Sequence, residues 1–419
     1  MKTLLICAAF VAGIQAVDAF AQLPPGDGPA TVSTTVNEPT PLKFDEALLA
    51  RLSVPAGFKA SVWARDAGNV RWMQVAPNGD VYVSRREQGD VMLLRGTDAQ
   101  GRVAERRIVA QNLKWVHGLA LRGGQLYMAT DKKVLAAAVL PDGALGEPRV
   151  LIDDLPDAGQ HPNRTLAFGP DGLLYITVGS TCNDCRESNP EAATIVQAQP
   201  DGRARSVFAR GLRNTIGFGW HPATGVMYGM DHGADYHGDD WPPEELNALM
   251  QGKHYGWPFC YERRVVDSRQ FNDPPHSTKR DFCPTTEPSV LTYTAHAAPI
   301  GMVFYTGAQF PAEFRNDAFV AMRGSWNRGQ PSGYKVVRVR FDAAGRPVAF
   351  EDFISGWLMA GPADTHARPG PAAGEAERRQ AQRPSQFGRL AGLAVAADGS
   401  LLVAEDQNGV IYRIQYQGR

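Results

Sequence analysis

One pattern recurs along the whole chain: a short apolar strand, an Asn-Gly or Asp-Gly type of turn, and a second apolar strand. The clearest copy is Leu166–Val178, in which Asp171-Gly172 forms the turn. The looser copies are, in chain order, 73–83, 119–127, 217–228, 302–320 and 393–403. Two apolar strands joined by such a turn are the strongest local signal of a β-hairpin. Six copies in one chain indicate a repeat architecture.

A second hairpin follows most of these copies and has a turn of its own. These outer hairpins begin at Val91, Val134, Ile195 and Val336. Two hairpins give four strands, which is one propeller blade. The strand at 409–416 has no fourth strand after it, and 58–63 can pair with it and remove the open edge.

The chain is therefore predicted to be an all-β protein, a six-bladed β-propeller of four-stranded antiparallel blades. A seventh blade hidden around 260–295 is the alternative. Insertions are expected near 231–298 and 362–386, and the propeller is expected to span 46–419.

The first residues read as a targeting segment. An apolar run at 4–16 follows Lys2, and small residues precede a cut near Ala21, so 1–21 is predicted to be a signal peptide. The run is too short to span a membrane. Residues 22–45 are rich in Pro, Thr and Gly and are predicted to be a flexible lead-in. The protein is expected to be periplasmic or secreted, without stable membrane insertion.

Net charge and cysteine content bear on which ligands and bonds the chain can have. A formal net charge of −1 over 419 residues lacks the basic excess of a nucleic-acid binder. Without Cys7, which falls in the signal segment, four cysteines remain, an even number in an oxidising compartment. The simplest pairs are Cys182 with Cys185 and Cys260 with Cys283, and a zinc site is the alternative. Arg186 stands where haem attachment needs a histidine, so any cytochrome must be a separate protein.

Polar residues occupy the same place before each inner hairpin, where the chain enters the central channel of a propeller. They are Arg71, His117, His161, Arg213 with Asn214, His296 and Arg389. Such a ring would attract an anionic ligand, and His161 or His296 is a candidate general base. The alternative is that these groups only satisfy buried carbonyls near the channel.

The stretch 231–247 is dense in oxygen ligands and turn residues, which suits a hard cation such as calcium. It does not have the spacing of an EF-hand. The alternative is a solvated acidic loop that leads into a short helix from Pro243 to Met250.

An ordered set of segments resembles the pyrroloquinoline quinone (PQQ) dependent sugar dehydrogenases, most closely the glucose/sorbosone or aldose dehydrogenase branch. The matching segments are 161–172, 179–185, 211–214, 238–247, 255–258, 324–328 and 409–413, and the similarity runs from about Pro55 to Tyr416. The resemblance implies a six-bladed propeller with PQQ over the channel mouth and a calcium ion beneath it. It also implies a small-molecule sugar as substrate and an external electron acceptor, either a separate cytochrome or a quinone.

The resemblance also implies roles for single residues. His161 falls on the family's general base, and Arg213 and Asn214 fall on residues that bind the quinone oxygens. Gly233 and Ala234 fall where main-chain carbonyls hold calcium. The remaining expected cofactor contacts are His232, Arg389, Arg323 in place of a lysine, His117 from the channel ring, and Arg164 as a further counter-charge.

Three positions depart from the soluble glucose dehydrogenase pattern. Val116 replaces a cofactor-contacting Gln, Gln160 replaces the Asp before the catalytic His, and Ala391 replaces an Arg that binds a cofactor carboxylate. The predicted function is an exported PQQ- and calcium-dependent oxidation of aldoses or related aldehydes and polyols. The alternatives are a metal-dependent lactonase on the same fold and a non-catalytic propeller that binds a carbohydrate or a protein.

Overall fold

The computed structural model describes residues 33–157, 159–269, 272–359 and 383–418, which belong to one compact unit, Val32–Arg419. Regular structure in these ranges is almost entirely β-strand. The α-helix that they contain is α1 (Lys279–Phe282), and the short 3-10 helices are Glu46–Arg51, Cys283–Thr285 and Ala312–Phe314. None of these helices has the length and apolar character that a membrane crossing requires.

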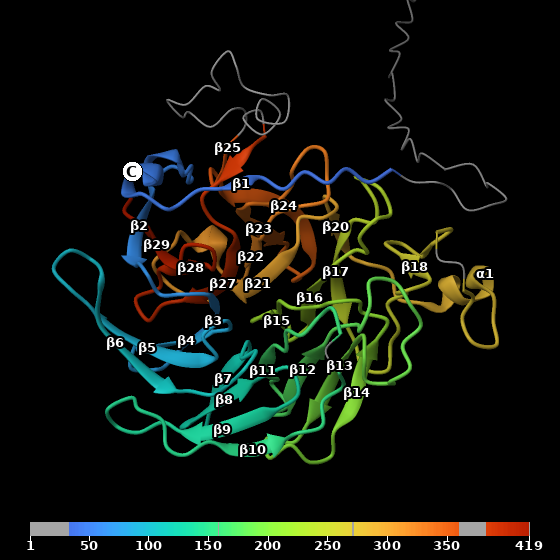
Figure 1. The fold of residues 1–419 in the computed structure, drawn as a ribbon, viewed down its shortest axis with the longest axis horizontal. Coiled ribbons are helices and arrows are strands. Elements are labelled where there is room, and N and C mark those ends of the chain that lie inside the picture. Colours follow the sequence, from blue (N-terminus) through green and yellow to red (C-terminus); the bar gives the residue numbers. More distant parts are fainter. Residues whose placement is uncertain (1–32, 158, 270–271, 360–382, 419) are drawn as a thin grey trace, which may run out of the picture. The chain divides into compact units, whose positions relative to one another are not determined.

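The described strands form six four-stranded antiparallel sheets, which we number in chain order (Figure 1). Sheet 1 contains β3 (Val70–Val75), β4 (Val81–Arg85), β5 (Asp90–Thr97) and β6 (Val103–Ala110), and sheet 2 contains β7 (Leu119–Arg122), β8 (Gln125–Ala129), β9 (Val134–Ala138) and β10 (Arg149–Ile152). Sheet 3 contains β11 (Leu166–Phe168), β12 (Leu174–Val178), β13 (Thr194–Ala198) and β14 (Ser206–Arg210), and sheet 4 contains β15 (Phe218–Trp220), β16 (Met227–Asp231), β17 (Glu244–Leu249) and β20 (Leu291–Tyr293). Sheet 5 contains β21 (Pro299–Phe304), β22 (Ala318–Met322), β23 (Lys335–Phe341) and β24 (Pro347–Ile354), and sheet 6 contains β27 (Leu390–Val395), β28 (Leu401–Glu405), β29 (Val410–Tyr416) and β2 (Phe58–Ala64).

The recurring hairpins form the first two strands of each sheet, as predicted. In the clearest copy, Leu166 lies opposite Ile176 and Phe168 lies opposite Leu174. The turn glycine Gly172 has φ 83°, a left-handed conformation that a glycine adopts without the strain of a Cβ.

Sheet 6 is assembled from the two ends of the folded unit. β2 is antiparallel to β29, with Phe58 opposite Tyr416 and Ser61 opposite Arg413. The predicted pairing of these strands is confirmed, and it leaves no unpaired strand edge on that side of β29.

Each sheet packs against the next one in the chain through its own cluster of buried apolar side chains. Sheets 1 and 2 share one such cluster, sheets 2 and 3 another, and the same holds for 3 with 4, 4 with 5, and 5 with 6. A further cluster joins sheet 6 back to sheet 1, where Trp63 and Ile411 pack with Met73 and Val83. This cyclic order of packing is the arrangement of a β-propeller.

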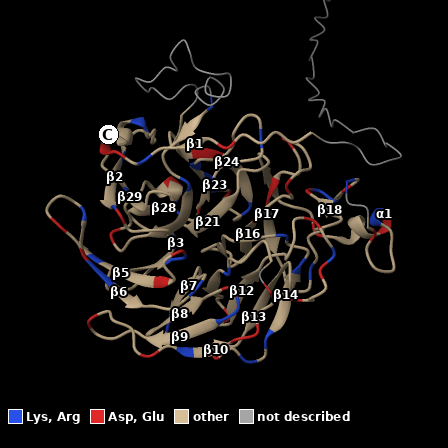
Figure 2. Cartoon of the chain, viewed as in Figure 1, with Lys and Arg blue, Asp and Glu red and all other residues tan. Residues whose placement is uncertain are grey.

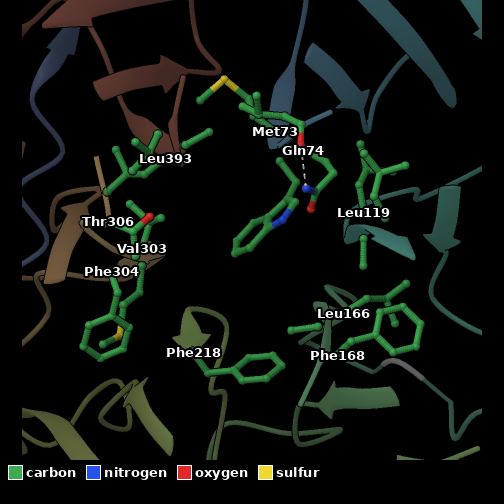
Figure 3. A pocket seen from close by; sticks show the side chains of 18 residues that line it. Met73, Gln74, Leu119, Leu166, Phe168, Phe218, Val303, Phe304, Thr306 and Leu393 are labelled. Carbon is green, nitrogen blue, oxygen red and sulfur yellow. Dashed lines mark hydrogen bonds between the residues drawn. The ribbon is translucent and has the colours of Figure 1, made fainter. Parts of the chain in front are cut away.

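The first strands of the sheets face a common centre. A pocket of about 380 Å³ there is lined by residues from β3, β7, β11, β15, β21 and β27 (Figure 3). Leu119, Phe218 and Leu393 lie around it, and its lining residues include none that titrates. The pocket therefore marks the channel axis, but it has no acid, base or charge with which to do chemistry.

The largest described insertion lies between the third and fourth strands of sheet 4. It contains the two-stranded sheet of β18 (Cys260–Tyr261) and β19 (Val265–Val266) followed by α1, and in its described residues it does not form a further four-stranded sheet. The alternative of a seventh blade at 260–295 is therefore wrong for these residues. Most of the insertion predicted at 362–386 lies outside the described residues.

The short helix considered for Pro243 to Met250 is also wrong, because Glu244–Leu249 is the third strand of sheet 4. The sequence Glu-Glu-Leu-Asn-Ala-Leu favours a helix by intrinsic propensity. Strand pairing with β16 and β20 and hydrogen bonds from distant backbone groups to both glutamates outweigh that preference.

Both predicted cysteine pairs are disulfides: Cys182 with Cys185 and Cys260 with Cys283. The second pair is fully buried and joins two segments of the insertion in sheet 4. The cysteines are thus used as structural bridges and not as a zinc site.

The described part of the predicted lead-in contacts loops of sheets 4, 5 and 6. β1 (Thr40–Pro41) pairs in parallel with β26 (Ser385–Gln386), which also pairs with β25 (Leu358–Met359). Thr35 N donates to Asp239 Oδ1 at 2.9 Å, which ties this segment to the loop that follows β16.

Candidate functional site

The predicted polar ring lies at the end of the channel opposite the apolar pocket. Arg71, His117 and Arg389 stand at or just before the start of β3, β7 and β27, whereas the pocket is lined by residues further along the same strands. Because the first strands run in the same sense along the axis, their N-terminal ends bring these side chains to one mouth. Figure 2 shows positively and negatively charged residues on the loops of the chain. An electrostatic attraction for anions at the channel mouth therefore depends on the polar ring itself.

The His161 side chain is held by the loop that follows β12. Its Nδ1 lies 2.7 Å from the Ser180 carbonyl oxygen and 2.9 Å from Ser180 Oγ, which itself donates to the Cys182 carbonyl at 2.7 Å. A carbonyl oxygen can only accept, so the proton is on Nδ1 and the lone pair is on Nε2. Ser180 thus orients the imidazole and leaves Nε2 as its acceptor atom, although Gln160 offers no carboxylate for this purpose.

The electrostatic surroundings keep His161 neutral. Burial, and next to it the positive charge of Arg213, lower the pKa of His161 to about 3. An imidazole with this pKa is unprotonated through the neutral pH range and can accept a proton at Nε2.

Gly179 allows His161 and Asn214 to approach one another. A Cβ on Gly179 would lie 2.6 Å from His161 Cβ and 2.9 Å from Asn214 Oδ1, closer than non-bonded atoms come. The glycine after β12 is therefore part of how the site is built.

Arg213 and Asn214 are fixed by a carboxylate beneath them. Asp231 accepts hydrogen bonds from the backbone N–H groups of both residues, at 2.8 and 2.9 Å, and from Thr215 Oγ1 at 2.8 Å. The Arg213 guanidinium donates to the Asn183 carbonyl and to Asn183 Oδ1, both at 2.8 Å. These contacts leave Arg213 buried and held in one orientation.

His232 bridges sheets 4 and 5 at the same mouth. Its Nε2 donates to the Pro299 carbonyl, so its Nδ1 carries the lone pair and lies 3.5 Å from Asn214 Nδ2. Burial lowers the pKa of His232 to about 4. Asn214 then turns Oδ1 toward Gly179, and that buried oxygen has no hydrogen-bond partner in the described part of the chain.

On the other side of the mouth, one carboxylate holds two arginines. Asp406 pairs with Arg71 and, at 2.7 Å, with Arg323, and these cations bring the pKa of Asp406 down to about 2 even though burial opposes this. Arg389 lies beside them and donates to the Gly324 carbonyl at 2.7 Å, and burial lowers its pKa to about 10. Arg86 adds a fourth guanidinium group near these three, and Glu87 and Glu38 act on them in addition to Asp406, which leaves a local excess of positive charge.

His117 is completely buried next to Trp72, and neither of its ring nitrogens has a hydrogen-bond partner among the described residues. Burial and the charge of Arg71 hold the pKa of His117 well below its usual value. Arg164 is equally buried, and its guanidinium donates to the backbone carbonyls of Asp131, His161 and Pro156. It supports the backbone of His161 directly, and its expected contact with a cofactor stays a prediction.

His296 has a different environment from His161. Its Nε2 lies 2.7 Å from the Gly238 carbonyl and its Nδ1 lies 3.4 Å from Asn327 Nδ2, so both nitrogens are engaged. His296 therefore holds the loop after β16, and the geometry favours His161 of the two candidate bases.

Gly233 and Ala234, the predicted calcium ligands, lie in the loop directly after β16. Gly233 N donates to Glu244 Oε2 at 3.0 Å, and Ala298 N donates to Glu244 Oε1 at 2.8 Å. Burial raises the pKa of Glu244 to about 8. The buried Glu244 thus binds backbone N–H groups at this loop. The main-chain carbonyls of Gly233 and Ala234 are then the groups that a hard cation would bind.

The mouth fits a polyanionic, oxygen-rich group such as PQQ. Several of its polar atoms are buried and lack hydrogen-bond partners in the described ranges. They are Arg71 Nε, Arg389 Nε, Asn214 Oδ1 and both ring nitrogens of His117. Buried polar atoms without a partner are uncommon in folded proteins and mark places where a ligand completes the hydrogen bonding.

The positioning roles of several residues of this site were not predicted from the sequence, although three of these residues lie in the segments 179–185 and 231–247 singled out there. Ser180, Asn183 and Asp231 orient His161 and Arg213, and Asp406 holds the arginine pair. Ser180, Asp231 and Asp406 stand at or within two residues of the C-terminal end of a second strand, β12, β16 or β28. That shared position is the signal that could have found them.

Known proteins similar to this chain were identified by sequence and by structure. A sequence model of the family described as TrAA12-like matches residues 52–417. A protein of Hypocrea jecorina (strain QM6a), named pyrroloquinoline quinone-dependent sugar dehydrogenase, is 24% identical over 283 residues, which are 56% of this chain and 61% of that protein. The chain spans about two to three fifths of the length of the curated relatives it matches.

Two solved structures share the fold over most of both chains. The Trichoderma reesei protein of Carbohydrate-Active Enzymes Family AA12 has a TM-score of 0.71 at 20% identity and covers 87% of this chain and 97% of its own. The PQQ domain of pyranose dehydrogenase from Coprinopsis cinerea, in its holo form, has a TM-score of 0.68 at 22% identity and covers 90% and 98%. These matches agree with the resemblance seen in the sequence.

Proposed function

Because the chain belongs to the TrAA12-like family, we propose that it is an exported, PQQ- and calcium-dependent dehydrogenase built on a six-bladed propeller. Its substrates are aldose sugars or related aldehydes and polyols, such as sorbosone. The electrons pass to an external acceptor, either a separate cytochrome or a quinone.

The observation that carries this proposal is the state of His161. Its Nδ1 is committed to the Ser180 carbonyl at 2.7 Å, and its Nε2 is an acceptor beside the buried cations of the mouth. We assign to Nε2 the removal of the proton from the substrate hydroxyl as the C–H bond breaks. When bound, PQQ supplies the quinone carbon that accepts the hydride.

The residues around the mouth have distinct parts in holding the cofactor. Arg213 and Asn214 would contact the quinone oxygens, where a fixed cation stabilises negative charge that develops during reduction. The other contacts are His117, Arg164, His232, Arg323 and Arg389. The positive excess around Asp406 suits the carboxylates of the cofactor, and we expect Arg323 and Arg389 to pair with them.

Calcium would bind the main-chain carbonyls of Gly233 and Ala234 together with the cofactor. A cation there polarises the oxygen that it binds and acts as a Lewis acid. Glu244, which belongs to β17, accepts a hydrogen bond from Gly233 N. The positions of the carbonyls proposed to bind calcium therefore depend on sheet 4 as well as on the loop.

The low pKa of His161 has a consequence for this role. Positive charge on Arg213 contributes to the lowered value of about 3, so an anionic group bound next to Arg213 offsets part of the effect and strengthens the base. The free protein therefore keeps His161 unprotonated, and binding of the cofactor moves its pKa toward the working pH.

The decisive experiment is reconstitution. The purified protein, freed of metal, is mixed with PQQ and calcium, and reduction of a redox dye is followed with a panel of aldoses and with sorbosone. Sugar-dependent reduction that needs both additions is the expected result. Absence of any activity together with absence of PQQ absorbance on the protein would refute the proposal, and lactone hydrolysis without PQQ would favour a hydrolase.

A pair of variants separates the base from the scaffold. His161→Gln should lower kcat by at least about 100-fold, the usual contribution of a general base, while PQQ binding and Tm stay near those of the parent protein. His254→Gln removes another buried histidine, whose pKa burial lowers to about 4, and should leave the activity unchanged. Equal losses in both variants would assign the effect to folding.

A further inference from the structure

One of the two disulfides lies beside the proposed cofactor mouth. Cys182 and Cys185 are three residues apart in the sequence and partly exposed, whereas Cys260 and Cys283 are 1% and 0% exposed. Because the first bridge closes a very short loop, it removes little chain entropy from the unfolded state and adds little to the global stability of the fold. Global stability therefore does not account for this bridge.

The first residue of the disulfide loop is bonded to the group that holds the proposed base. Ser180 Oγ donates to the Cys182 carbonyl at 2.7 Å and lies 2.9 Å from His161 Nδ1, and the Ser180 carbonyl accepts from the same nitrogen at 2.7 Å. Ser180 is fully buried, so its hydroxyl has no solvent to bond to, and the Cys182 carbonyl fixes its direction. A movement of Cys182 therefore changes the surroundings of His161.

The second residue of the disulfide loop holds the cation of the site. Arg213 Nε donates to the Asn183 carbonyl and Arg213 Nη2 donates to Asn183 Oδ1, both at 2.8 Å. Asn183 also exchanges two hydrogen bonds with Asp235, since Asp235 N donates to Asn183 Oδ1 at 2.8 Å and Asn183 Nδ2 donates to the Asp235 carbonyl at 3.0 Å. The orientation of Arg213 thus depends on the main chain and the side chain of one residue inside the bridge.

The disulfide constrains a segment without regular secondary structure. The structure describes the whole of 179–193, which connects β12 and β13, and shows neither a helix nor a strand in it. Glu187 accepts hydrogen bonds from Thr181 N at 2.6 Å and from Thr181 Oγ1 at 2.8 Å, which closes the base of the loop outside the bridge. Opening the disulfide would therefore release the backbone of Cys182 and Asn183 while the base of the loop stays attached.

We propose that the Cys182–Cys185 disulfide positions His161 and Arg213, and that a dithiol opens it reversibly and so switches the site off. The roles of His161 and Arg213 in this inference rest on the proposed function, whereas the chemistry of the bridge does not. A thiolate of the dithiol attacks one sulfur of the bridge, the S–S bond breaks, and a mixed disulfide forms. The second thiol of the reductant then displaces the chain from this mixed disulfide. The chain gains two electrons and two protons as two thiols, and the reductant leaves as a disulfide.

The other bridge serves as an internal control for this reaction. Exposed disulfides are the labile ones, and Cys260–Cys283 is fully buried. It also closes a longer loop, with a sequence separation of 23, so it contributes more to stability and resists reduction in the folded chain. A reductant is therefore expected to open the two bridges at different concentrations.

The first experiment counts thiols in the full purified chain, in excess CaCl2 so that a loss of calcium cannot cause the result. The chain is titrated with dithiothreitol, free thiols are alkylated with iodoacetamide, and the labelled peptides are identified by mass spectrometry. We expect Cys182 and Cys185 to be labelled together, without a change in circular dichroism, at a concentration that leaves Cys260 and Cys283 unlabelled. The bridge should form again after the reductant is removed in air. Labelling of both pairs in one step, or no labelling short of unfolding, would overturn the proposal.

Variants test the positioning role without a thiol reagent, because thiols also react with quinones and reduce dyes. In Cys182→Ser/Cys185→Ser, the affinity for PQQ in excess CaCl2 should fall about 10-fold, the effect of one lost hydrogen bond to a charged group. The kcat of the reconstituted variant should fall about 100-fold, with Tm near that of the parent protein. Cys260→Ser/Cys283→Ser should lose stability but keep the parent affinity and kcat at temperatures below its unfolding. Equal effects in the two double variants would overturn the positioning role.

A measurement on His161 separates this inference from the proposed function. The hydrogen bond to the Ser180 carbonyl should protect the Nδ1 proton from exchange, which gives a persistent signal in nuclear magnetic resonance that is absent from His161→Gln. We expect this signal to disappear in Cys182→Ser/Cys185→Ser and in the reduced parent chain, and to persist in Cys260→Ser/Cys283→Ser. An unchanged signal in the reduced chain would overturn the inference. If the signal changes as expected but no form of the protein oxidises a sugar with PQQ, the proposed function fails and the positioning by the disulfide stands.

Discussion

The approach of His161 to Asn214 across Gly179 gives the sharpest test of the proposed site. In a Gly179→Ala variant, the added Cβ would lie 2.6 Å from His161 Cβ and 2.9 Å from Asn214 Oδ1. Ordinary contacts between carbon atoms lie at about 3.5 to 4.0 Å, so the histidine has to move by roughly 1 Å. Gly179 does not have a left-handed φ, so the backbone itself tolerates alanine and the effect is steric.

A displacement of this size has a large effect on catalysis and a smaller one on folding. A misplacement of about 1 Å can lower the rate on the order of 100-fold, which corresponds to about 2.7 kcal/mol in the barrier. Overpacking of a buried position costs about 1 to 3 kcal/mol of stability. We expect kcat/KM for dye reduction with the reconstituted enzyme to fall about 100-fold, while urea denaturation still shows one cooperative transition.

A matched glycine serves as the control. In Gly146→Ala the nearest atom to the new Cβ is Ala138 Cβ at 3.7 Å, and the position lies in an outer loop of sheet 2. This variant should keep the parent kcat/KM. If Gly179→Ala also kept it, His161 would not be held by the contacts described above, and the reasoning about the base would be refuted.

Three further predictions concern stability. Asp406→Asn should lower the free energy of unfolding by about 3 to 5 kcal/mol, the cost of leaving a buried cation without its partner, and added PQQ should recover part of the loss in urea denaturation. Replacing Cys260 and Cys283 by serine should cost about 3 kcal/mol, since the bridge closes a loop of sequence separation 23; an unchanged urea midpoint would contradict this. Because the pKa values of His161 and His232 are lowered to about 3 and about 4, from an unfolded value near 6.5, their contribution to stability is present above pH 6.5 and lost as the pH falls toward 4. Denaturation midpoints at pH 7 and pH 5 check this, and equal midpoints would show that these rings are not buried as neutral groups.

The hairpins could be predicted because they depend on local signals, which are apolar alternation and the turn residues between strands. The pairing of β2 with β29 is not local, and it could be predicted because the last strand has no fourth strand after it and 58–63 was available to pair with it. The strand at Glu244–Leu249 could not, because its residues favour a helix and its buried glutamates are satisfied only by distant backbone groups. Intrinsic helix propensity therefore gave the wrong secondary structure at Glu244–Leu249, where long-range hydrogen bonds determine the structure.

The candidate site divides in the same way. Side chains just before the first strand of each sheet, such as His161 and Arg213, could be found because polar residues recur at that position from sheet to sheet. Ser180 and Asp406, which orient and neutralise them, follow other strands and acquire their partners only through the fold. The residues proposed to bind the ligand could therefore be predicted from the sequence, whereas the residues that position them could not.

The pairing of β2 with β29 has a consequence for the order in which the sheets can be completed. Since Phe58 lies opposite Tyr416, sheet 6 cannot form until the last strand has been synthesised, and contacts so distant in sequence form slowly. Sheets 1 to 5 contain neither β2 nor β29 and can form before the last strand is available. A chain that lacks its last strand would therefore leave sheet 6 open and expose an unpaired edge of β2, so sheet 6 is the last sheet to be completed.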